Sequence, residues 1–160
     1  HLLKNLISIK QLLRYHKIKF KQRIRILRKF VLLFILITLP VFGSEIIDKR
    51  KQLYQKNNDN MKLIYSAISS ENFEQVIKSA GEIEAFANKM TDYFPVGSVS
   101  RGSSENIWSD FEGFTKAAKL NSNAAKTLRI AAQDNKLDEL NSLFSELSST
   151  CKSCHRSYKN

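Results

Sequence analysis

Residues 136–159 read KLDELNSLFSELSSTCKSCHRSYK, with apolar side chains recurring every three or four positions. Such spacing places side chains on one face of a helix. The face consists of Leu137, Leu140, Phe144, Leu147, Cys151, Cys154, His155 and Tyr158. Because the series continues through both cysteines and the histidine, we expect these three side chains to face the interior of a helical bundle.

Within this stretch, Cys151, Cys154 and His155 form the C-x-x-C-H pattern of covalent c-type haem attachment. Each thiol can form a thioether with one vinyl group of the porphyrin, and the adjacent imidazole can ligate the iron. The alternatives are a thioredoxin-like redox pair, a single disulfide and half of a zinc site. A redox pair expects a βαβ context, and a zinc site needs more ligands than the two cysteines of this chain supply. We therefore predict one covalent haem c, with His155 as the proximal iron ligand.

The formal net charge of +11 lies almost entirely in the first 43 residues. These residues include ten basic and no acidic side chains, whereas from Ser44 onward 16 basic residues are balanced by 15 acidic ones. A surface that binds nucleic acid needs its basic excess on the folded part of the protein. The composition therefore excludes nucleic-acid binding.

The basic segment is followed by a 13-residue apolar run, residues 30–42, which is short for a membrane span and typical of a signal peptide. We predict a leader over residues 1–43, a folded domain over residues 44–160 and a periplasmic location, where this type of haem attachment takes place in bacteria. The alternative is a retained N-terminal anchor. The first methionine is Met61. One interpretation is that translation begins at a codon other than that of methionine within the leader, which would leave part of residues 1–25 untranslated. The other is that the sequence is a piece of a longer one.

Three further stretches show helical periodicity: residues 45–69, the segment from Ser70 to Phe94, and residues 104–132. Their expected core residues are Ile47, Tyr54, Met61, Ile64 and Ile68 in the first stretch, Phe73, Val76, Ile77, Ala80, Ile83, Ala87, Met90 and Phe94 in the second, and Ile107, Trp108, Phe111, Phe114, Ala118, Leu128 and Ala132 in the third. Pro95 to Ser103 is expected to be a loop. No stretch alternates as a strand would, so the sequence predicts an all-α, antiparallel four-helix bundle with a covalently bound haem between facing helices.

Taken together, these features resemble the cytochrome c prime family, the class II c-type cytochromes. The matching motifs are Cys-Lys-x-Cys-His followed by Tyr158 and Lys159 for the last helix, Ile107-Trp108-x-Asp110-Phe111 for the third, Tyr93-Phe94-Pro95-x-Gly97 for the second, and Arg50 with Met61-Lys62 and Ile64 for the first. The resemblance covers essentially all of residues 44–160 and implies one covalent haem in a four-helix bundle.

The resemblance also implies roles for individual residues. Tyr54, four residues after Arg50, is expected over the open side of the iron, where relatives often have Leu, Phe or Met. Arg50 is expected to pair with a haem propionate, and Met61 and Tyr158 to line the haem pocket. Family members often dimerise through their first two helices, which makes a homodimer one alternative, but Lys56, Asn57, Asn58 and Asp59 offer little apolar surface for such a contact. The sequence departs from the family pattern where Lys51 replaces a common Gln and Lys159 a common Arg.

The candidates for the open face of the iron are Tyr54, Met61, Met90 and Lys51. A methionine at helical spacing more often packs than ligates. Tyr54 could be a packed aromatic ring, a hydrogen-bond donor to an iron-bound ligand, or a phenolate ligand. The last option requires a nearby positive charge to lower its pKa from about 10. Trp108 is expected to pack, with its indole N–H bonded to an acceptor.

His155 is the only histidine of residues 44–160, so the sequence excludes ligation of the iron by two histidines of one chain. We therefore expect five-coordinate iron that binds small diatomic gases such as nitric oxide or carbon monoxide. The alternative is a six-coordinate, low-spin electron carrier, whose redox partner the sequence does not identify. A weak peroxidase ranks below both because no distal histidine is present, and we expect no enzyme activity. A thiol-redox or scaffold protein without haem is the remaining possibility.

Overall fold

The structure is a computed structural model that describes Lys19, Arg23 and residues 45–160. Residues 43–160 form one compact unit. The expected leader therefore lies outside the described residues apart from Lys19 and Arg23, and its role in export stays a prediction. No helix among the described residues combines the length and the apolar character needed to cross a membrane.

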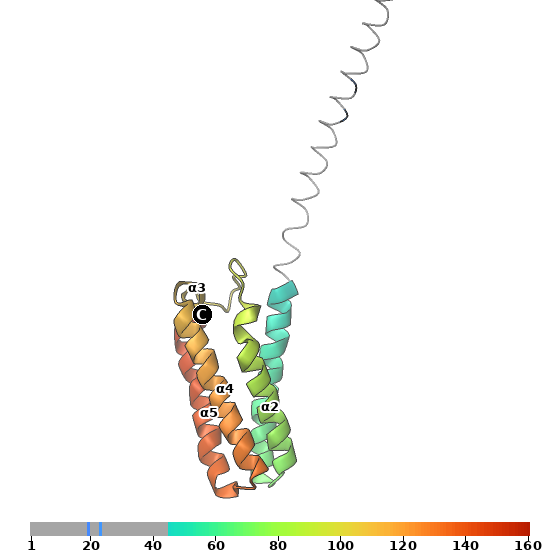
Figure 1. Cartoon of the computed structure of the whole chain (residues 1–160), viewed down its shortest axis with the longest axis vertical. Helices are drawn as coiled ribbons and strands as arrows, with labels where there is room; N and C mark the ends of the chain where they lie inside the picture. Colours follow the sequence, from blue (N-terminus) through green and yellow to red (C-terminus); the bar gives the residue numbers. More distant parts are fainter. Residues whose placement is uncertain (1–18, 20–22, 24–44) are drawn as a thin grey trace, which may run out of the picture. The chain divides into compact units, whose positions relative to one another are not determined.

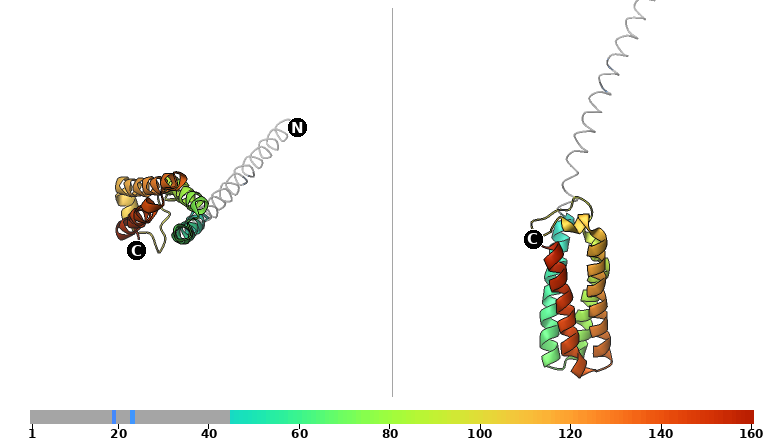
Figure 2. Two further views of the ribbon diagram at one scale, coloured as in Figure 1. Left: turned by 90° about the horizontal axis from the view of Figure 1, so that it is seen from below. Right: turned by 90° about the vertical axis from the view of Figure 1, so that its left-hand side faces the viewer.

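Four long helices make up most of residues 45–160, and consecutive ones run in opposite directions (Figures 1 and 2). They span residues 45–69, Phe73–Lys89 (α2), Phe111–Gln133 (α4) and Leu137–Tyr158 (α5). Two short helices, Met90–Tyr93 (η1) and Asn106–Ser109 (α3), lie in the connection between α2 and α4. The prediction of an all-α, antiparallel four-helix bundle is confirmed.

Two short turns, residues 70–72 and 134–136, connect the long helices at one end of the bundle. Glu71 and Asn135 have φ angles of 54° and 56°, the left-handed conformation that commonly ends a helix. The side chain of Asn72 caps α2 by accepting a hydrogen bond of 3.0 Å from the backbone N–H of Gln75. The expected helix start after Ser70 is therefore wrong by two residues, because the left-handed turn at Glu71 moves the cap to Asn72.

The α-helical part of the second segment also ends earlier than expected. α2 stops at Lys89, and the tighter helix η1 continues the chain to Tyr93. Phe94 then leaves helical geometry, with φ −124° and ψ 51°. Proline disfavours helical backbone at the residue before it, so Pro95 accounts for the end of the helical run at Tyr93.

The expected third helix is broken in two at Asp110. This residue has φ −127° and ψ 57°, and its side chain caps α4 by accepting a hydrogen bond of 3.1 Å from the N–H of Gly113. An aspartate followed by a helical run is a common start signal, which the apolar periodicity across it concealed. The prediction of one continuous helix from residue 104 is therefore wrong.

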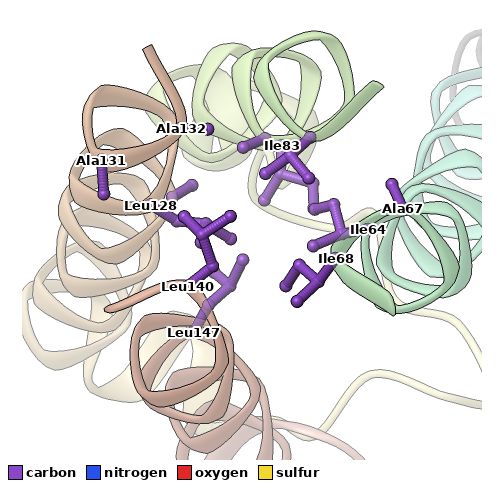
Figure 3. Packing of buried hydrophobic residues seen from close by; sticks show 12 residues of the cluster. Ile64, Ala67, Ile68, Ile83, Leu128, Ala131, Ala132, Leu140 and Leu147 are labelled. Carbon is purple, nitrogen blue, oxygen red and sulfur yellow. The ribbon is translucent and has the colours of Figure 1, made fainter. Parts of the chain in front are cut away.

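Buried side chains form two clusters along the bundle. The aliphatic cluster, to which all four long helices contribute near the short turns (Figure 3), consists of Ile64, Ala67, Ile68, Val76, Ala80, Ile83, Ala125, Leu128, Ala131, Ala132, Leu140 and Leu147. The aromatic cluster, nearer the long connection, consists of Phe86, Ala87, Met90, Phe94, Ile107, Phe114 and Ala118. Most expected core residues are buried in one of the two. Phe111 is an exception at 44% exposed, since it is the first residue of α4 after the break at Asp110.

Candidate haem site

A pocket of about 450 Å³ lies beside the aromatic cluster and includes residues close to the C-terminus in its lining. Figure 1 shows that the C-terminus lies at the same end of the bundle as the connection between α2 and α4. The helix of residues 45–69 and the end of α5 both contribute to the pocket wall, and the connection between α2 and α4 completes it. The lining residues are Arg50, Lys51, Tyr54, Gln55, Asn58, Phe94, Ser100, Gly102, Ser103, Ile107, Phe114, Cys154, His155, Tyr158 and Lys159. A volume of this size is typical of small-molecule and cofactor sites.

The last turns of α5 carry the haem-attachment residues, of which Cys154 and His155 line this pocket. Cys151 and Cys154 are half-buried free thiols, and Cys154 packs against the aromatic cluster. His155 lines the pocket but is exposed, so the expectation that it faces the bundle interior is wrong. It follows Cys154 directly and therefore lies beside the buried face rather than on it. Partial burial and the charge of Lys159 lower the pKa of His155, which favours the neutral imidazole needed for iron ligation.

The free thiols and the surrounding residues bear on the alternatives to haem. Cys151 and Cys154 form no disulfide. The described residues contain no cluster of three or more His, Cys, Asp or Glu side chains that could hold a zinc ion. Two thiols, an imidazole and an aromatic wall are instead the donor set and the apolar surface that a covalent haem requires. The chemistry of the site therefore fits a c-type haem.

Tyr54 faces the same pocket from the helix of residues 45–69. Its ring packs edge-on against Phe86, with centroids 5.0 Å apart, and against Phe94 at 6.5 Å. Burial is the main cause that raises the pKa of Tyr54 well above its usual value, and the nearby Arg50 opposes this rise only in part. The side chain is therefore a neutral phenol, which disfavours the phenolate alternative and leaves the hydroxyl available as a donor.

Arg50 is 4% exposed and holds the long connection in place. Its Nη1 donates to the carbonyl of Tyr93 at 3.3 Å and to Ser98 Oγ at 3.4 Å. Its Nη2 donates to the carbonyl of Ser98 at 2.9 Å and to Ser100 Oγ at 3.0 Å, and the guanidinium lies 4.2 Å from the centre of the Phe94 ring. Arg50 also lines the pocket, and its expected contact with a haem propionate stays a prediction. Most of its N–H groups already donate to residues of the connection between α2 and α4.

Tyr158 lines the pocket as expected and fastens the end of α5 to α4. Its hydroxyl donates to Asp110 Oδ2 at 2.7 Å, and its ring packs edge-on against Phe114 with centroids 5.3 Å apart. A Cβ at Gly113 would meet the Asp110 carboxylate and the Tyr158 hydroxyl, so a larger residue there would displace this hydrogen-bonded pair. This contact could not be predicted from local sequence patterns, because it joins residues 48 positions apart.

The two methionines do not line the pocket. Met61 packs against the aliphatic cluster, and Met90 is buried within the aromatic cluster. Met61 lies about two turns further along the helix than Tyr54, so the prediction that it belongs to the haem pocket gains no support from this lining. Lys51 does line the pocket, and its Nζ forms a salt bridge of 3.1 Å with Asp48.

Several parts of the pocket wall were not predicted from the sequence. Phe94 and Phe114 were expected only as core residues, yet both line the pocket, as do Ser100, Gly102 and Ser103 of the segment expected to be a loop. The indole N–H of Trp108 bonds the carbonyls of Phe94 and Pro95, at 3.1 and 3.2 Å, as its expected need for an acceptor implied. The aromatic residues on both sides of Pro95 in the sequence were the one pattern that could have indicated this part of the pocket wall.

An antiparallel four-helix bundle with two thiols and an imidazole beside a pocket at the end of its last helix defines a c-type haem protein. The chain belongs to the cytochrome c' family, since a family model described as Cytochrome C' matches residues 45–159. Members of this family bind one covalent haem c, so the predicted cofactor is confirmed.

Individual relatives agree with the family model. The chain is 27% identical over 118 residues to cytochrome c' from Rhodospirillum rubrum, covering 71% of this chain and 80% of that one. It is also 27% identical over 119 residues to cytochrome c' from Pararhodospirillum photometricum, covering 71% and 94%.

Solved structures of the family share the fold. The crystal structure of cytochrome c' from Thermochromatium tepidum matches with a TM-score of 0.67 and 26% identity, covering 73% of this chain and 95% of that one. A second structure is described as a cytochrome c' with an unusual ligand-controlled dimer dissociation. It matches with a TM-score of 0.68 and 27% identity over the same shares of the two chains.

Proposed function

We propose that this protein is an exported mono-haem cytochrome whose iron has one protein ligand, His155, and binds small diatomic gases on the side facing Tyr54. The composition of the pocket wall carries this proposal. Its lining residues include one imidazole and no methionine, and they present the neutral phenol of Tyr54 from the helix of residues 45–69. When bound, the haem supplies an iron centre with an exchangeable coordination position.

The side chains around the pocket have distinct roles in this proposal. His155 would hold the iron through its imidazole, and the hydroxyl of Tyr54 would be the hydrogen-bond donor available to a bound diatomic molecule. The rings of Phe94 and Phe114, 4.9 Å apart, exclude water from the wall between them. Arg50 fixes the connection that closes the pocket. The relative described by its ligand-controlled dimer dissociation gives independent support for ligand binding and for a homodimer.

A six-coordinate electron carrier is the second candidate, and the position of Lys51 is the observation that favours it. Lys51 lines the pocket, and its amine could ligate iron if the salt bridge to Asp48 opened. The methionines give this candidate less support than the sequence suggested, because neither Met61 nor Met90 lines the pocket.

The visible spectrum of the purified ferrous protein, with and without carbon monoxide, tests the proposal. We expect a high-spin spectrum that changes on addition of carbon monoxide. A low-spin spectrum that carbon monoxide leaves unchanged would favour the electron carrier. In that case Lys51→Ala should convert the iron to high spin if Lys51 is the sixth ligand, while Lys49→Ala serves as the matched control.

The proposed export rests on the sequence of residues 1–43 alone. Expression of the full chain with its leader, followed by fractionation of the cells, should place the haem-containing protein in the periplasm. Recovery of the intact leader in the membrane fraction would favour the retained anchor. Sedimentation of the periplasmic protein with and without carbon monoxide tests whether it forms a homodimer.

A further inference from the structure

A buried amide on α4 contacts one of the two haem-attachment cysteines. Asn121 is 4% exposed, and its Nδ2 lies 3.5 Å from Cys151 Sγ and 2.9 Å from Thr150 Oγ1. An amide nitrogen carries two protons, so it can donate to both atoms at once. Asn121 therefore links α4 to the first cysteine of the attachment motif.

The orientation of this amide follows from its neighbour. The hydroxyl of Thr150 has a single proton and donates it to the carbonyl of Leu147 at 2.7 Å. Its oxygen must therefore accept from Asn121, which places the amide nitrogen, and not the amide oxygen, toward Thr150. The other N–H of the same group is then directed at the Cys151 sulfur.

This orientation of the Asn121 amide leaves a buried hydrogen-bond acceptor without a partner. Asn121 Oδ1 is buried and has no hydrogen-bond partner within residues 45–160. Buried acceptors without a partner are unfavourable and uncommon. The adjacent residue, Ser122, is also buried, but its hydroxyl donates to Asn88 Oδ1 at 2.7 Å. The unpaired oxygen of Asn121 is therefore explained by the two contacts of its nitrogen, one of which is the sulfur.

The two cysteines consequently have different surroundings. Both thiols are half-buried, but Nδ2 of Asn121 lies 3.5 Å from the Cys151 sulfur. No hydrogen bond reaches the Cys154 sulfur from the part of the chain that the structure describes. An N–H donor suits a sulfur that accepts, as a thiolate or a thioether does, and Cys151 alone has one.

We propose that Asn121 is a positioning residue for haem attachment: its amide holds the Cys151 sulfur in place, so that Cys151 forms its thioether before Cys154. The step is an addition of the thiol across a vinyl double bond. A sulfur–carbon bond forms, the S–H and the carbon–carbon π bond break, and the proton goes to the other vinyl carbon, so no oxidant is needed. The inference rests on the covalent haem of the family and not on gas binding, so each can fail without the other.

The order of attachment in the full chain tests this proposal. Reduced protein purified without haem is mixed anaerobically with ferrous haem, quenched with acid at successive times and alkylated with N-ethylmaleimide. Peptide mass spectrometry then shows which cysteine carries haem in singly linked chains. We expect Cys151 to be preferred about three- to tenfold, the range that one hydrogen bond supports. Asn121→Leu should reduce this preference to about one.

Two further variants separate positioning from folding. Ser122→Ala removes the hydroxyl of the neighbouring buried residue and should leave the preference unchanged. Thr150→Val removes the hydrogen bond that orients the Asn121 amide and should lower the preference for Cys151. This variant tests the proposal if Asn121→Leu does not fold. The proposal is overturned if the parent first links at Cys154 or forms no bond at Cys151. It is also overturned if the preference for Cys151 persists in Asn121→Leu. A third contrary result is an equal loss of haem from both cysteines in Asn121→Leu and in Ser122→Ala.

Discussion

The hydroxyl of Tyr158 and the carboxylate of Asp110, 2.7 Å apart, join the end of α5 to the start of α4. The second oxygen of the same carboxylate caps α4 through the N–H of Gly113. One side chain therefore both starts the helix that forms a wall of the pocket and anchors the helix that carries His155.

Asp110→Ala should lower the free energy of unfolding by about 1–3 kcal/mol, because it removes a helix cap and a hydrogen bond together. Asp110→Asn keeps an oxygen for the cap and a donor for Tyr158, so its effect should be smaller. Urea denaturation of the two variants and the parent measures the difference. Equal losses in the two variants would show that the charge, and not the pair of bonds, stabilises this corner.

Stability at high pH should depend on Tyr158. Its hydrogen bond to Asp110 raises its pKa to about 12, above the value of about 10 in the unfolded chain. The stabilisation is therefore complete below pH 10 and is lost as the pH rises from about 10 to 12. Tyr158→Phe should reduce this pH dependence, measured as the free energy of unfolding between pH 8 and 11.5. Identical curves for Tyr158→Phe and the parent would contradict the assignment.

Arg50→Met should release the long connection, since it leaves the carbonyls of Tyr93 and Ser98 without their donors. The expected loss is about 2–4 kcal/mol, as for other buried polar groups left unpaired. Arg101 is exposed in the same connection, so trypsin should cleave after it faster in this variant than in the parent. Lys49→Ala, at the adjacent exposed position outside the pocket, is the control and should be cleaved at the parent rate.

Substitutions of Tyr54 test its hydrogen bond and its bulk separately. Tyr54→Phe removes the hydroxyl and should speed carbon monoxide dissociation about three- to tenfold, the value of one net hydrogen bond. Tyr54→Ala also opens the pocket and should speed ligand entry far more. Flash photolysis and stopped-flow mixing measure the two rates. If neither rate changes, Tyr54 is an ordinary packing residue and does not face the iron.

The parts of the fold that follow local patterns could be predicted from the sequence. Residues 45–69 form a helix with the expected bounds, and α5 differs from its expected span by one residue at each end. The break at Asp110 could not be predicted from periodicity, because apolar residues continue in phase on both sides of it. A cap that satisfies a local hydrogen bond there outweighs the continuation of the helix.

Some residues of the site could likewise be predicted from the sequence, and others could not. Cys151, Cys154 and His155 could be identified because the attachment chemistry fixes their spacing in the sequence. Arg50 illustrates what could not be foreseen, since four of its contacts are made with residues 43 to 50 positions away. Helical periodicity shows which face of a helix is apolar, but it does not show which loop a long side chain reaches.

The separation of the two clusters has a consequence for how the molecule opens. At one end of the bundle, turns of three residues join successive helices, whereas at the pocket end the closing contacts join distant segments, such as Asn160 with Ser103. Segments closed by distant contacts lose more chain entropy when they order. Amide hydrogen exchange should therefore be fastest around the pocket and slowest around Leu128, so that partial unfolding exposes the haem end while the remainder of the bundle stays intact.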